Sequence, residues 1–467
     1  MLIRRAEVWR KGLADVRIAE GRIAAIGALE ARPGEAVIEA HGGALLPGLH
    51  DHHIHLAALT ARRDSVLCGP PDVTDRNGLA RRLAEAPGTG WLRGIGYHES
   101  VMGLPGAREL DALLAHRPLR LQHRSGRMWL LNSAALDDLL SRAAPPSGLE
   151  REAGGYSGRL FEGDDWLQQT LAASPPDLTD LSRELAACGI TGMTDMSPRN
   201  GDVMAAHVAA QRASGGLLQR CTLAGTLELA EVAEVAAGTC QLGPAKLHLH
   251  EADLPAFDRA EAFLRAAHAQ ERAVAVHCVS EVELVFAVAL FEAAGTVRGD
   301  RIEHASVASD AMIARMAALG LHVCVQPHFI AERGDRYLVD VEPQHHAELY
   351  RLQSLKRAGL HLCGGSDAPF GSADPWQAMA AARSRRTDGG QVIGENEALT
   401  AEEALTLYLA DPADITRQRS IAPGQVADLC LLGCDWQSAR LRLSADDVRA
   451  TIVGGHLIHD GIDQPPI

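Results

Sequence analysis

A repeating unit dominates the hydrophobic pattern of the chain: a short apolar run that ends in a polar residue and is usually followed by an alanine-rich stretch of helical periodicity. Eight such runs occur, at residues 44–55, 189–196, 218–225, 244–251, 273–280, 300–306, 321–328 and 360–367. Strands that alternate with helices form parallel sheets, and eight units are typical of a closed barrel. The pattern therefore predicts an α/β fold built on a distorted (β/α)8 TIM barrel.

Residues 256–270 illustrate one of the helical stretches. Apolar residues recur there every three or four positions and fall on one helical face: Phe257, Ala260, Phe263, Leu264 and Ala267. A helix needs such a stripe to pack against a sheet. We therefore interpret this stretch as an ordinary barrel helix.

Both ends of the chain have the pattern of β structure. Residues 13–27 alternate as two short β segments around Glu20-Gly21, and a similar pattern recurs around Gly454-Gly455. Two extended segments joined by a tight Gly-containing turn predict a β-hairpin. These ends are expected to flank the barrel.

Roughly 130 residues separate the first apolar run from the second. Ordinary loops have only a few residues, so this stretch predicts an inserted subdomain, placed at residues 57–185. Two strand-like segments lie in it, at 91–98 and 117–123, followed by a Gly/Pro/Asp-rich link around 144–180.

The composition narrows the choice of partner. The 467 residues include 45 Lys+Arg and 60 Asp+Glu, a formal charge of −15, and 46% are hydrophobic. This chain can bury a large core, and its acidic balance disfavours nucleic acid and membrane surfaces. A small-molecule substrate is the expected partner, and a homo-oligomer is compatible with these features.

Cysteine usage and the first residues suggest the compartment. The chain has nine cysteines, an odd number without a CxxC pair, which argues against a disulfide framework. Its N-terminal residues carry a charge every few positions, and no apolar run approaches the 18 or so residues that span a bilayer. A soluble cytoplasmic protein is expected.

Metal-binding side chains recur at the ends of the predicted strands, where the open face of a barrel forms. His53 and His55 are two residues apart, so both imidazoles point the same way on a strand and are suited to a zinc-like cation. A lone histidine at a strand end is usually a core residue. The coincidence is repeated, however, at Lys246, His277, His304 and Asp367.

The motifs LLPGLHDHHIHL, RLQHRSGRMWLLNSAAL, VAVHCVS, RIEHAS and GSDAPFGSADPW resemble those of the metal-dependent amidohydrolase superfamily. They resemble in particular its amidohydrolase family 3, or YtcJ-like, branch. This resemblance runs from about residue 1 to 460. It implies a barrel at 46–414 and a small β-sandwich that combines residues 1–45 with 415–467.

The resemblance also implies a set of ligands. His53 and His55 would hold the more buried ion, with zinc as the expected metal, and His277 and His304 would hold a second ion. Lys246 matches a lysine that many relatives carry in carboxylated form as a bridge between two ions. A plain structural lysine is the alternative, because an unmodified lysine cannot ligate a metal.

One feature departs from the family pattern. The lysine is followed by Leu247-His248-Leu249-His250, so two further histidines share its face on a regular strand. They would add a ligand, hydrogen-bond the bridging group or pack against the next strand. The number of divalent ions, one or two, therefore remains open.

The expected reaction is hydrolysis of a carbon–nitrogen bond other than a peptide bond. A divalent ion activates a water and polarises the electrophile, while Asp367 takes the proton and returns it to the leaving nitrogen. The alternative role of Asp367 is helix capping or a turn. Alternative functions are an esterase or lactonase, a deaminase, and a non-catalytic metal-binding scaffold.

Substrate contacts are predicted from two places. Tyr97, His98 and Arg124 lie at the ends of the two strand-like segments of the insertion, which the resemblance places over the barrel mouth. Gln326 and His328 follow the seventh predicted strand, at the end of the run 321–328. A surface salt bridge is an equal alternative for Arg124, and an ordinary loop position is an equal alternative for Gln326 and His328.

Overall fold

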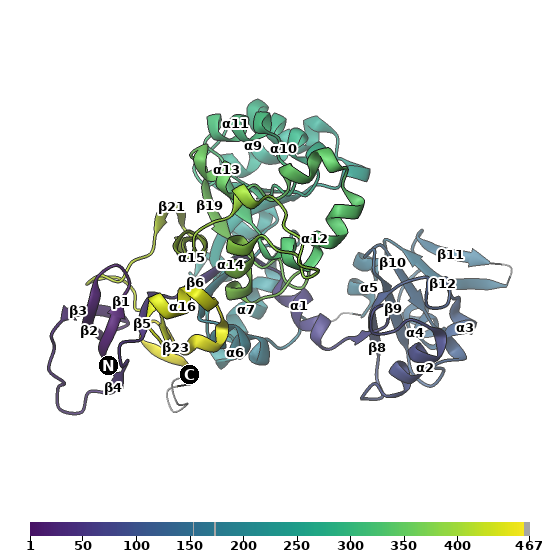
Figure 1. The fold of residues 1–467 in the computed structure, drawn as a ribbon. Helices are drawn as coiled ribbons and strands as arrows, with labels where there is room; N and C mark the ends of the chain where they lie inside the picture. Colours follow the sequence, from purple (N-terminus) through teal and green to yellow (C-terminus); the bar gives the residue numbers. More distant parts are fainter. Residues whose placement is uncertain (153, 172–173, 462–467) are drawn as a thin grey trace. The chain divides into compact units, whose positions relative to one another are not determined.

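The central element is a sheet of eight parallel strands that closes into a barrel (Figure 1). In the computed structural model, which describes residues 1–152, 154–171 and 174–461, each of these strands coincides with one of the predicted apolar runs, although β15 begins three residues before its run. In spatial order they are β6 (Leu49–Ile54), β13 (Ile190–Asp195), β14 (Arg220–Gly225), β15 (Gln241–His248), β16 (Val274–Cys278), β17 (Arg301–His304), β18 (His322–Val325) and β19 (His361–Gly364). The predicted (β/α)8 barrel is confirmed.

The barrel closes through the residues that follow β19. The backbone N–H of Asp367 donates to the carbonyl of His53 at 2.6 Å, and the N–H of His55 donates to the carbonyl of Ala368 at 2.9 Å. The first and last strands therefore meet at the carboxyl-terminal rim, where two of the predicted ligand groups lie.

Helices follow most of the strands. They are α6 (Thr179–Ala187), α7 (Asp202–Ser214), α8 (Ala233–Ala236), α9 (Phe257–Ala269), α10 (Glu281–Ala294), α11 (Asp310–Ala318), α12 (His328–Asp340), α13 (Leu352–Arg357), α14 (Pro375–Ser384) and α15 (Ala401–Leu409). Helix α9 buries Ala260, Leu264 and Ala267, as its periodicity predicts. A capping box between Ser280 and Glu283 begins α10 directly after β16.

Strands from both chain ends share one sheet. It consists of β1 (Leu2–Val8), β2 (Gly12–Ala19), β3 (Arg22–Gly27), β4 (Val37–Glu39), β5 (Ala44–Pro47), β22 (Leu429–Leu432), β23 (Val448–Val453) and β24 (His456–Asp460). Strands β5 and β22 pair antiparallel and join the two ends, which lie side by side in Figure 1. The apolar residues Val8, Val16, Leu431 and Ile452 lie in the core of this composite structure.

Both predicted hairpins are present in the composite sheet. Glu20 and Gly21 have φ of 52° and 72°, and Gly454 and Gly455 have φ of 55° and 79°. Positive φ at both central residues is the geometry of the tight hairpin turn whose twist matches the flanking strands. Strand β21 (Asp414–Gln418) pairs instead with β20 (Ala410–Asp411), so the C-terminal part of the composite sheet begins at Leu429.

The insertion forms a compact unit of its own, residues 57–176. Its sheet has the order β11 (Leu149–Glu152), β12 (Gly155–Phe161), β10 (Met128–Leu131), β9 (Leu119–His123), β8 (Leu92–Tyr97) and β7 (Val66–Leu67). Its described helices are α1 (Leu56–Arg63), whose first residue precedes the unit, α2 (Arg76–Ala84), α3 (Ala107–Asp111), α4 (Ser133–Arg142) and α5 (Asp164–Leu171). The two predicted strand-like segments correspond to β8 and β9.

The predicted link at 144–180 differs from the structure. It contains the β11–β12 hairpin and α5, because the residues of β12 pair with β10 and continue the sheet. Gly154 and Gly155 have φ of 115° and 147°, so they serve the turn between the two strands.

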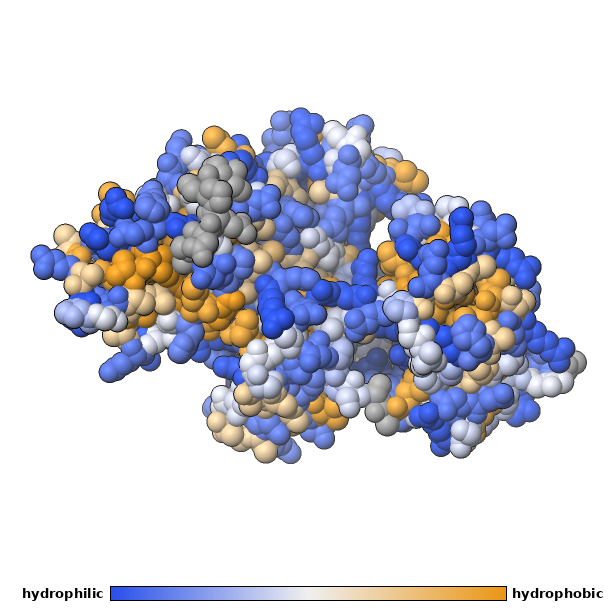
Figure 2. Space-filling view, turned by 90° about the horizontal axis from the view of Figure 1, so that it is seen from below, coloured by the Kyte–Doolittle hydropathy of each residue, from blue (hydrophilic) through white to orange (hydrophobic). Residues whose placement is uncertain are grey.

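The described helices include none that is long and apolar enough to cross a membrane. Hydrophilic side chains make up most of the face shown in Figure 2, with apolar side chains in patches between them.

Arg385 offers a test of the fold beside the barrel. Its guanidinium is fully buried and donates to the carbonyls of Ile393 (2.9 Å), Tyr350 (3.0 Å) and Leu349 (2.9 Å). The carbonyl of Tyr350 also accepts the backbone N–H of Leu352 at 2.9 Å, so Arg385→Leu leaves the buried carbonyls of Leu349 and Ile393 without a donor. Each unsatisfied group costs roughly 1–3 kcal/mol, so the free energy of unfolding is expected to fall by about 2 kcal/mol or more.

Thermal unfolding measures this effect, with Arg386→Leu as the matched control. Arg386 is exposed and makes one 3.2 Å bond to the carbonyl of Gly390. Equal melting temperatures for the two variants would contradict the structural role of Arg385.

Candidate metal centre

Asp367 and the two histidines at the end of β6, His53 within the strand and His55 just after it, meet at one point on the barrel rim. Asp367 Oδ1 lies 3.2 Å from His53 Nε2 and 3.1 Å from His55 Nε2. All three side chains are largely withdrawn from solvent, His53 at 1% and Asp367 at 10% side-chain exposure. The two histidines thus share a face of β6, as their spacing predicts.

Strand β6 carries an irregularity just before this pair. Its register against β13 shifts between Asp51 and Ile54, where β6 has one residue more than its neighbour. The carboxylate of Asp51 stabilises the region, because one oxygen accepts the N–H groups of His53 and Ser366, each at 3.0 Å. This buried carboxylate ties β6 to the segment that carries Asp367.

The histidines of β16 and β17 form the other half of the cluster. His304 Nε2 lies 2.9 Å from His277 Nδ1, and the His304 ring centroid lies 4.9 Å from that of His53. The His248 ring stacks on His277 at 4.2 Å, so this extra histidine adjoins the cluster. His250 lies farther along, 6.4 Å from His248 between ring centroids.

Potential ligand atoms of His53, His304 and Asp367 all lie within 4.8 Å of one another. These residues come from the first, sixth and eighth barrel strands, or directly follow them. His55 and His277 extend the same group through the contacts with Asp367 and His304 described above. The structure therefore brings five of the six predicted metal-binding side chains into one connected group.

Two of these residues have unusual backbone conformations. His304 has φ of 72° and Asp367 has φ of 51°, both in the left-handed region. Non-glycine residues rarely adopt this region, and they cluster at functional sites where the surrounding structure holds them.

A chain of buried charges that the sequence analysis did not identify supports His53. Its Nδ1–H donates to Glu303 Oε2 at 2.5 Å, and Arg301 Nε–H donates to Glu303 Oε1 at 2.5 Å. Glu303 is fully buried. Because each of its oxygens already accepts a hydrogen bond, Glu303 orients His53 as a carboxylate orients a metal-ligating histidine.

The signal for Glu303 is present in the sequence. Arg301 and Glu303 alternate on a strand that should be apolar, directly before His304. A charged pair at such positions indicates a buried ionic contact, although the partner His53 is 250 residues away.

The protonation of His53 points to a cation at this place. With Nδ1–H donated to Glu303, the neutral ring has its lone pair on Nε2, facing an Asp367 oxygen at 3.2 Å. Two acceptors so close need a proton or a cation between them. Burial and Lys246 oppose protonation, yet Glu303 and Asp367 raise the pKa of His53. A bound cation would replace that proton.

The other groups have the charge states that a metal requires. Burial lowers the pKa of His304 to about 3 and that of His277 still further, so both rings are neutral near pH 7. Burial alone would raise the pKa of Asp367, but His53 and His55 hold it well below its usual range. Neutral imidazoles and an ionised carboxylate are the ligand forms for divalent ions.

Lys246 gives a second sign that a group belongs here. Lys246 as a whole is 5% exposed, and its Nζ is buried with no hydrogen-bond partner among the described residues. Burial lowers its pKa. A buried amine without a partner is unusual in a complete apolar core and is typical of a functional site.

The predicted substrate-contact residues lie in several environments. Gln326 is fully buried, and its Oε1 accepts a hydrogen bond from His304 Nδ1 at 2.8 Å. His328 is also buried, and its Nε2–H donates to the carbonyl of Ser366 at 2.9 Å. Both therefore adjoin the predicted metal-binding side chains, while their contact with substrate stays a prediction.

Three further predicted contacts lie in the insertion. Tyr97 is buried and donates through its hydroxyl to the carbonyl of Gly103 at 2.7 Å. His98 and Arg124 follow β8 and β9 directly. Their role toward a substrate of the barrel stays a prediction.

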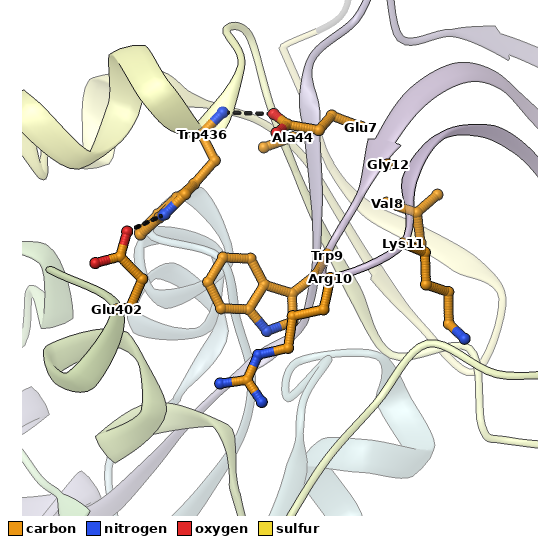
Figure 3. Close-up of a pocket in the computed structure, with 9 residues that line it drawn as sticks. All are labelled: Glu7, Val8, Trp9, Arg10, Lys11, Gly12, Ala44, Glu402 and Trp436. Carbon is orange, nitrogen blue, oxygen red and sulfur yellow. Dashed lines mark hydrogen bonds between the residues drawn. The ribbon is translucent and has the colours of Figure 1, made fainter.

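A separate cavity of about 360 Å³ contains none of the predicted site residues (Figure 3). It lies between the β1–β2 turn, α15 and α16 (Trp436–Arg442). The backbone N–H of Trp436 donates to Glu7 at 2.6 Å and its indole N–H donates to Glu402 at 2.9 Å. Both acids thus attach α16 to its neighbours.

A (β/α)8 barrel whose strand ends gather histidines, a lysine and an aspartate defines the class of metal-dependent barrel hydrolases. The model of the family described as "Amidohydrolase family" matches residues 36–459. The chain therefore belongs to the amidohydrolase family, and it is a metal-dependent hydrolase of carbon–nitrogen bonds.

Individual relatives agree with this assignment. The chain is 26% identical to an N-substituted formamide deformylase of Arthrobacter pascens, over 90% of each chain. It is also 26% identical to the putative amidohydrolase YtcJ of Bacillus subtilis (strain 168), over 91% of this chain and 90% of that one. An uncharacterized metal-dependent hydrolase from Pyrococcus horikoshii has the same fold, with a TM-score of 0.75, 20% identity and coverage of 98% and 99%.

The Glu303 contact predicts the effect of one substitution. Glu303→Gln removes the charge that faces Arg301 and weakens the hydrogen bond that orients His53. Loss of such an orienting carboxylate typically costs 10–100-fold in metal affinity, so we expect a loss of this size.

Competition with a chromophoric zinc chelator measures the affinity, with Glu292→Gln as control. Glu292 is an exposed residue of α10 that pairs with Arg315 at 2.6 Å. An unchanged affinity in a folded Glu303→Gln protein would contradict the orienting role.

Proposed function

We propose that the protein hydrolyses an amide, N-acyl or cyclic amide or imide bond of a small molecule, with zinc as the resident metal. The observation that carries this proposal is the convergence of His53, His304 and Asp367 within 4.8 Å at the open rim of the barrel. A formamide deformylase among the relatives favours an amide over an ester as the scissile group.

The first ion would be held by His53 and His55, and a second one by His277 and His304. Zinc prefers imidazole nitrogen and carboxylate oxygen, which are the donors of this cluster. When bound, the metal polarises the carbonyl of the substrate and lowers the pKa of a water molecule.

Asp367 is proposed as the group that moves the proton. Its carboxylate is ionised near pH 7, because its pKa lies well below the usual range. It therefore accepts a proton from the attacking water and donates it to the leaving nitrogen. The backbone bond to His53 at 2.6 Å holds Asp367 at the rim while it does so.

Lys246 is proposed to carry a carboxylate on Nζ and to bridge two ions. Carboxylation converts an amine that cannot ligate into an anionic oxygen ligand. It also removes the unsatisfied buried amine. The adjoining His248 ring would pack beside the bridging group, since it already stacks on His277.

Removal of the metal and substitution of Asp367 test the reaction. Dialysis against a chelator is expected to abolish hydrolysis of N-substituted formamides and N-acyl amino acids, and added Zn²⁺ to restore it. Asp367→Asn is expected to lower kcat by about 10²–10⁴-fold, the usual contribution of general acid–base catalysis.

The control is Asp388→Asn, an exposed carboxylate elsewhere in the chain. Rates are compared on matched amides, esters and aminopyrimidines, together with metal content. Preferred hydrolysis of esters, or of the exocyclic amine, would replace the amide proposal by an esterase or a deaminase. A protein that binds no zinc would contradict the proposal altogether.

Carboxylation of Lys246 has a direct spectroscopic test. The chain contains three lysines, Lys11, Lys246 and Lys356, so a carbamate signal can be assigned. Protein equilibrated with ¹³C-bicarbonate is expected to show a carbamate resonance that Lys246→Ala lacks and Lys356→Ala retains. Acetate is expected to restore part of the activity of Lys246→Ala, because a free carboxylate can occupy the cavity left by the side chain.

Two results together would identify Lys246 as a structural lysine. The wild-type protein would show no carbamate resonance, and acetate would not restore the activity of Lys246→Ala.

A further inference from the structure

Two loops of the insertion have the same local structure. Strands β8 and β9 are parallel neighbours, and each is continued by a His-x-Ser sequence, His98 to Ser100 and His123 to Ser125. In both loops the backbone N–H of the serine donates to Nδ1 of the histidine at 3.2 Å. The serine hydroxyls lie 2.7 and 2.8 Å from the same nitrogens.

This arrangement fixes the position of the proton on both rings. A backbone N–H group can only donate, so Nδ1 of each histidine has to present its lone pair. The proton of the neutral ring is therefore on Nε2. His98 and His123 each offer an Nε2–H donor that the loop itself has oriented.

One carboxylate oxygen of Glu99 lies near both Nε2 atoms and is hydrogen-bonded to that of His123. Glu99 Oε2 lies 2.8 Å from His123 Nε2 and 3.4 Å from His98 Nε2. The two rings lie nearly parallel, with an interplanar angle of 23° and centroids 6.2 Å apart. The pair thus forms a clamp with the geometry to hold an anionic oxygen from two sides.

The histidines are the fixed part of this clamp and Glu99 is the replaceable part. The side chains of His98 and His123 are 22% and 14% exposed, whereas that of Glu99 is 54% exposed. The hydrogen bond from His123 lowers the pKa of Glu99 to about 2, so the clamp favours an ionised carboxylate. Arg124, which lies between His123 and Ser125, is exposed and has no ion-pair partner among the described residues.

We propose that His98, His123 and Arg124 form a binding site for the carboxylate group of a small molecule, with Glu99 as the internal carboxylate that the ligand displaces. The carboxyl ends of parallel strands are the usual place for ligands in open α/β sheets. When the ligand displaces Glu99, the guanidinium of Arg124 supplies the positive charge of the site. Its planar shape also matches that of a carboxylate.

A metal site made of the same side chains is the principal rival. Coordination through Nε2 would require the proton on Nδ1, where it would face the N–H groups of Ser100 and Ser125. The tautomers therefore favour an anion over a cation at this place. The evidence for this site comes from the insertion alone and does not rest on the reaction proposed for the barrel.

Ligand-detected saturation-transfer NMR with benzoate tests the site, and benzamide serves as the uncharged probe of the same shape. Glu99→Ala removes the internal carboxylate and is expected to bind benzoate at least tenfold more tightly than the wild-type protein, with no gain for benzamide. Adding His123→Gln or Arg124→Gln to Glu99→Ala is expected to reverse that gain.

Two outcomes would overturn the proposal: no gain in benzoate affinity for Glu99→Ala, or a gain that persists in both double variants. A wild-type protein that binds one more Zn²⁺ per chain than His98→Gln would also overturn it in favour of a metal site. Circular dichroism shows whether each variant is folded. Zinc content and amide hydrolysis of Glu99→Ala report on the barrel separately, so failure of one proposal is distinguished from failure of the other.

Discussion

The junction between the first and last strands of the barrel is the contact on which the candidate site depends. The N–H of Asp367 donates to the carbonyl of His53, and the carboxylate of Asp51 accepts N–H groups from both sides of the junction. Barrel closure therefore places the backbones of Asp367 and His53 beside each other.

The buried charges below this junction explain why the site keeps its shape. Arg301 and Glu303 are both buried, and Glu303 continues to His53. A buried ion pair gains little net stability over an apolar pair, but breaking it costs roughly 3–5 kcal/mol. Such a pair resists rearrangement, so it orients a ligand even where it adds little to the overall stability of the fold.

Much of this organisation follows from the sequence because each barrel strand carries its own signal. An apolar run followed by a polar residue marks a strand end locally, and the runs predicted β6 and β13–β19. The hydrogen bond of Glu303 to His53 depends on which strands face each other across the barrel, and no local pattern contains that information. The β11–β12 hairpin was assigned to a link because its glycines resemble those of a linker, although they form a turn.

The pairing of β5 with β22 has a consequence for biosynthesis. A ribosome releases the N-terminal strands long before Leu429 emerges, so β5 has an open edge during most of translation. Unpaired edges invite association with other chains, and domains whose halves are distant in sequence rely on late contacts to protect them. For this protein, the nascent chain stays vulnerable until nearly the last strand has been made.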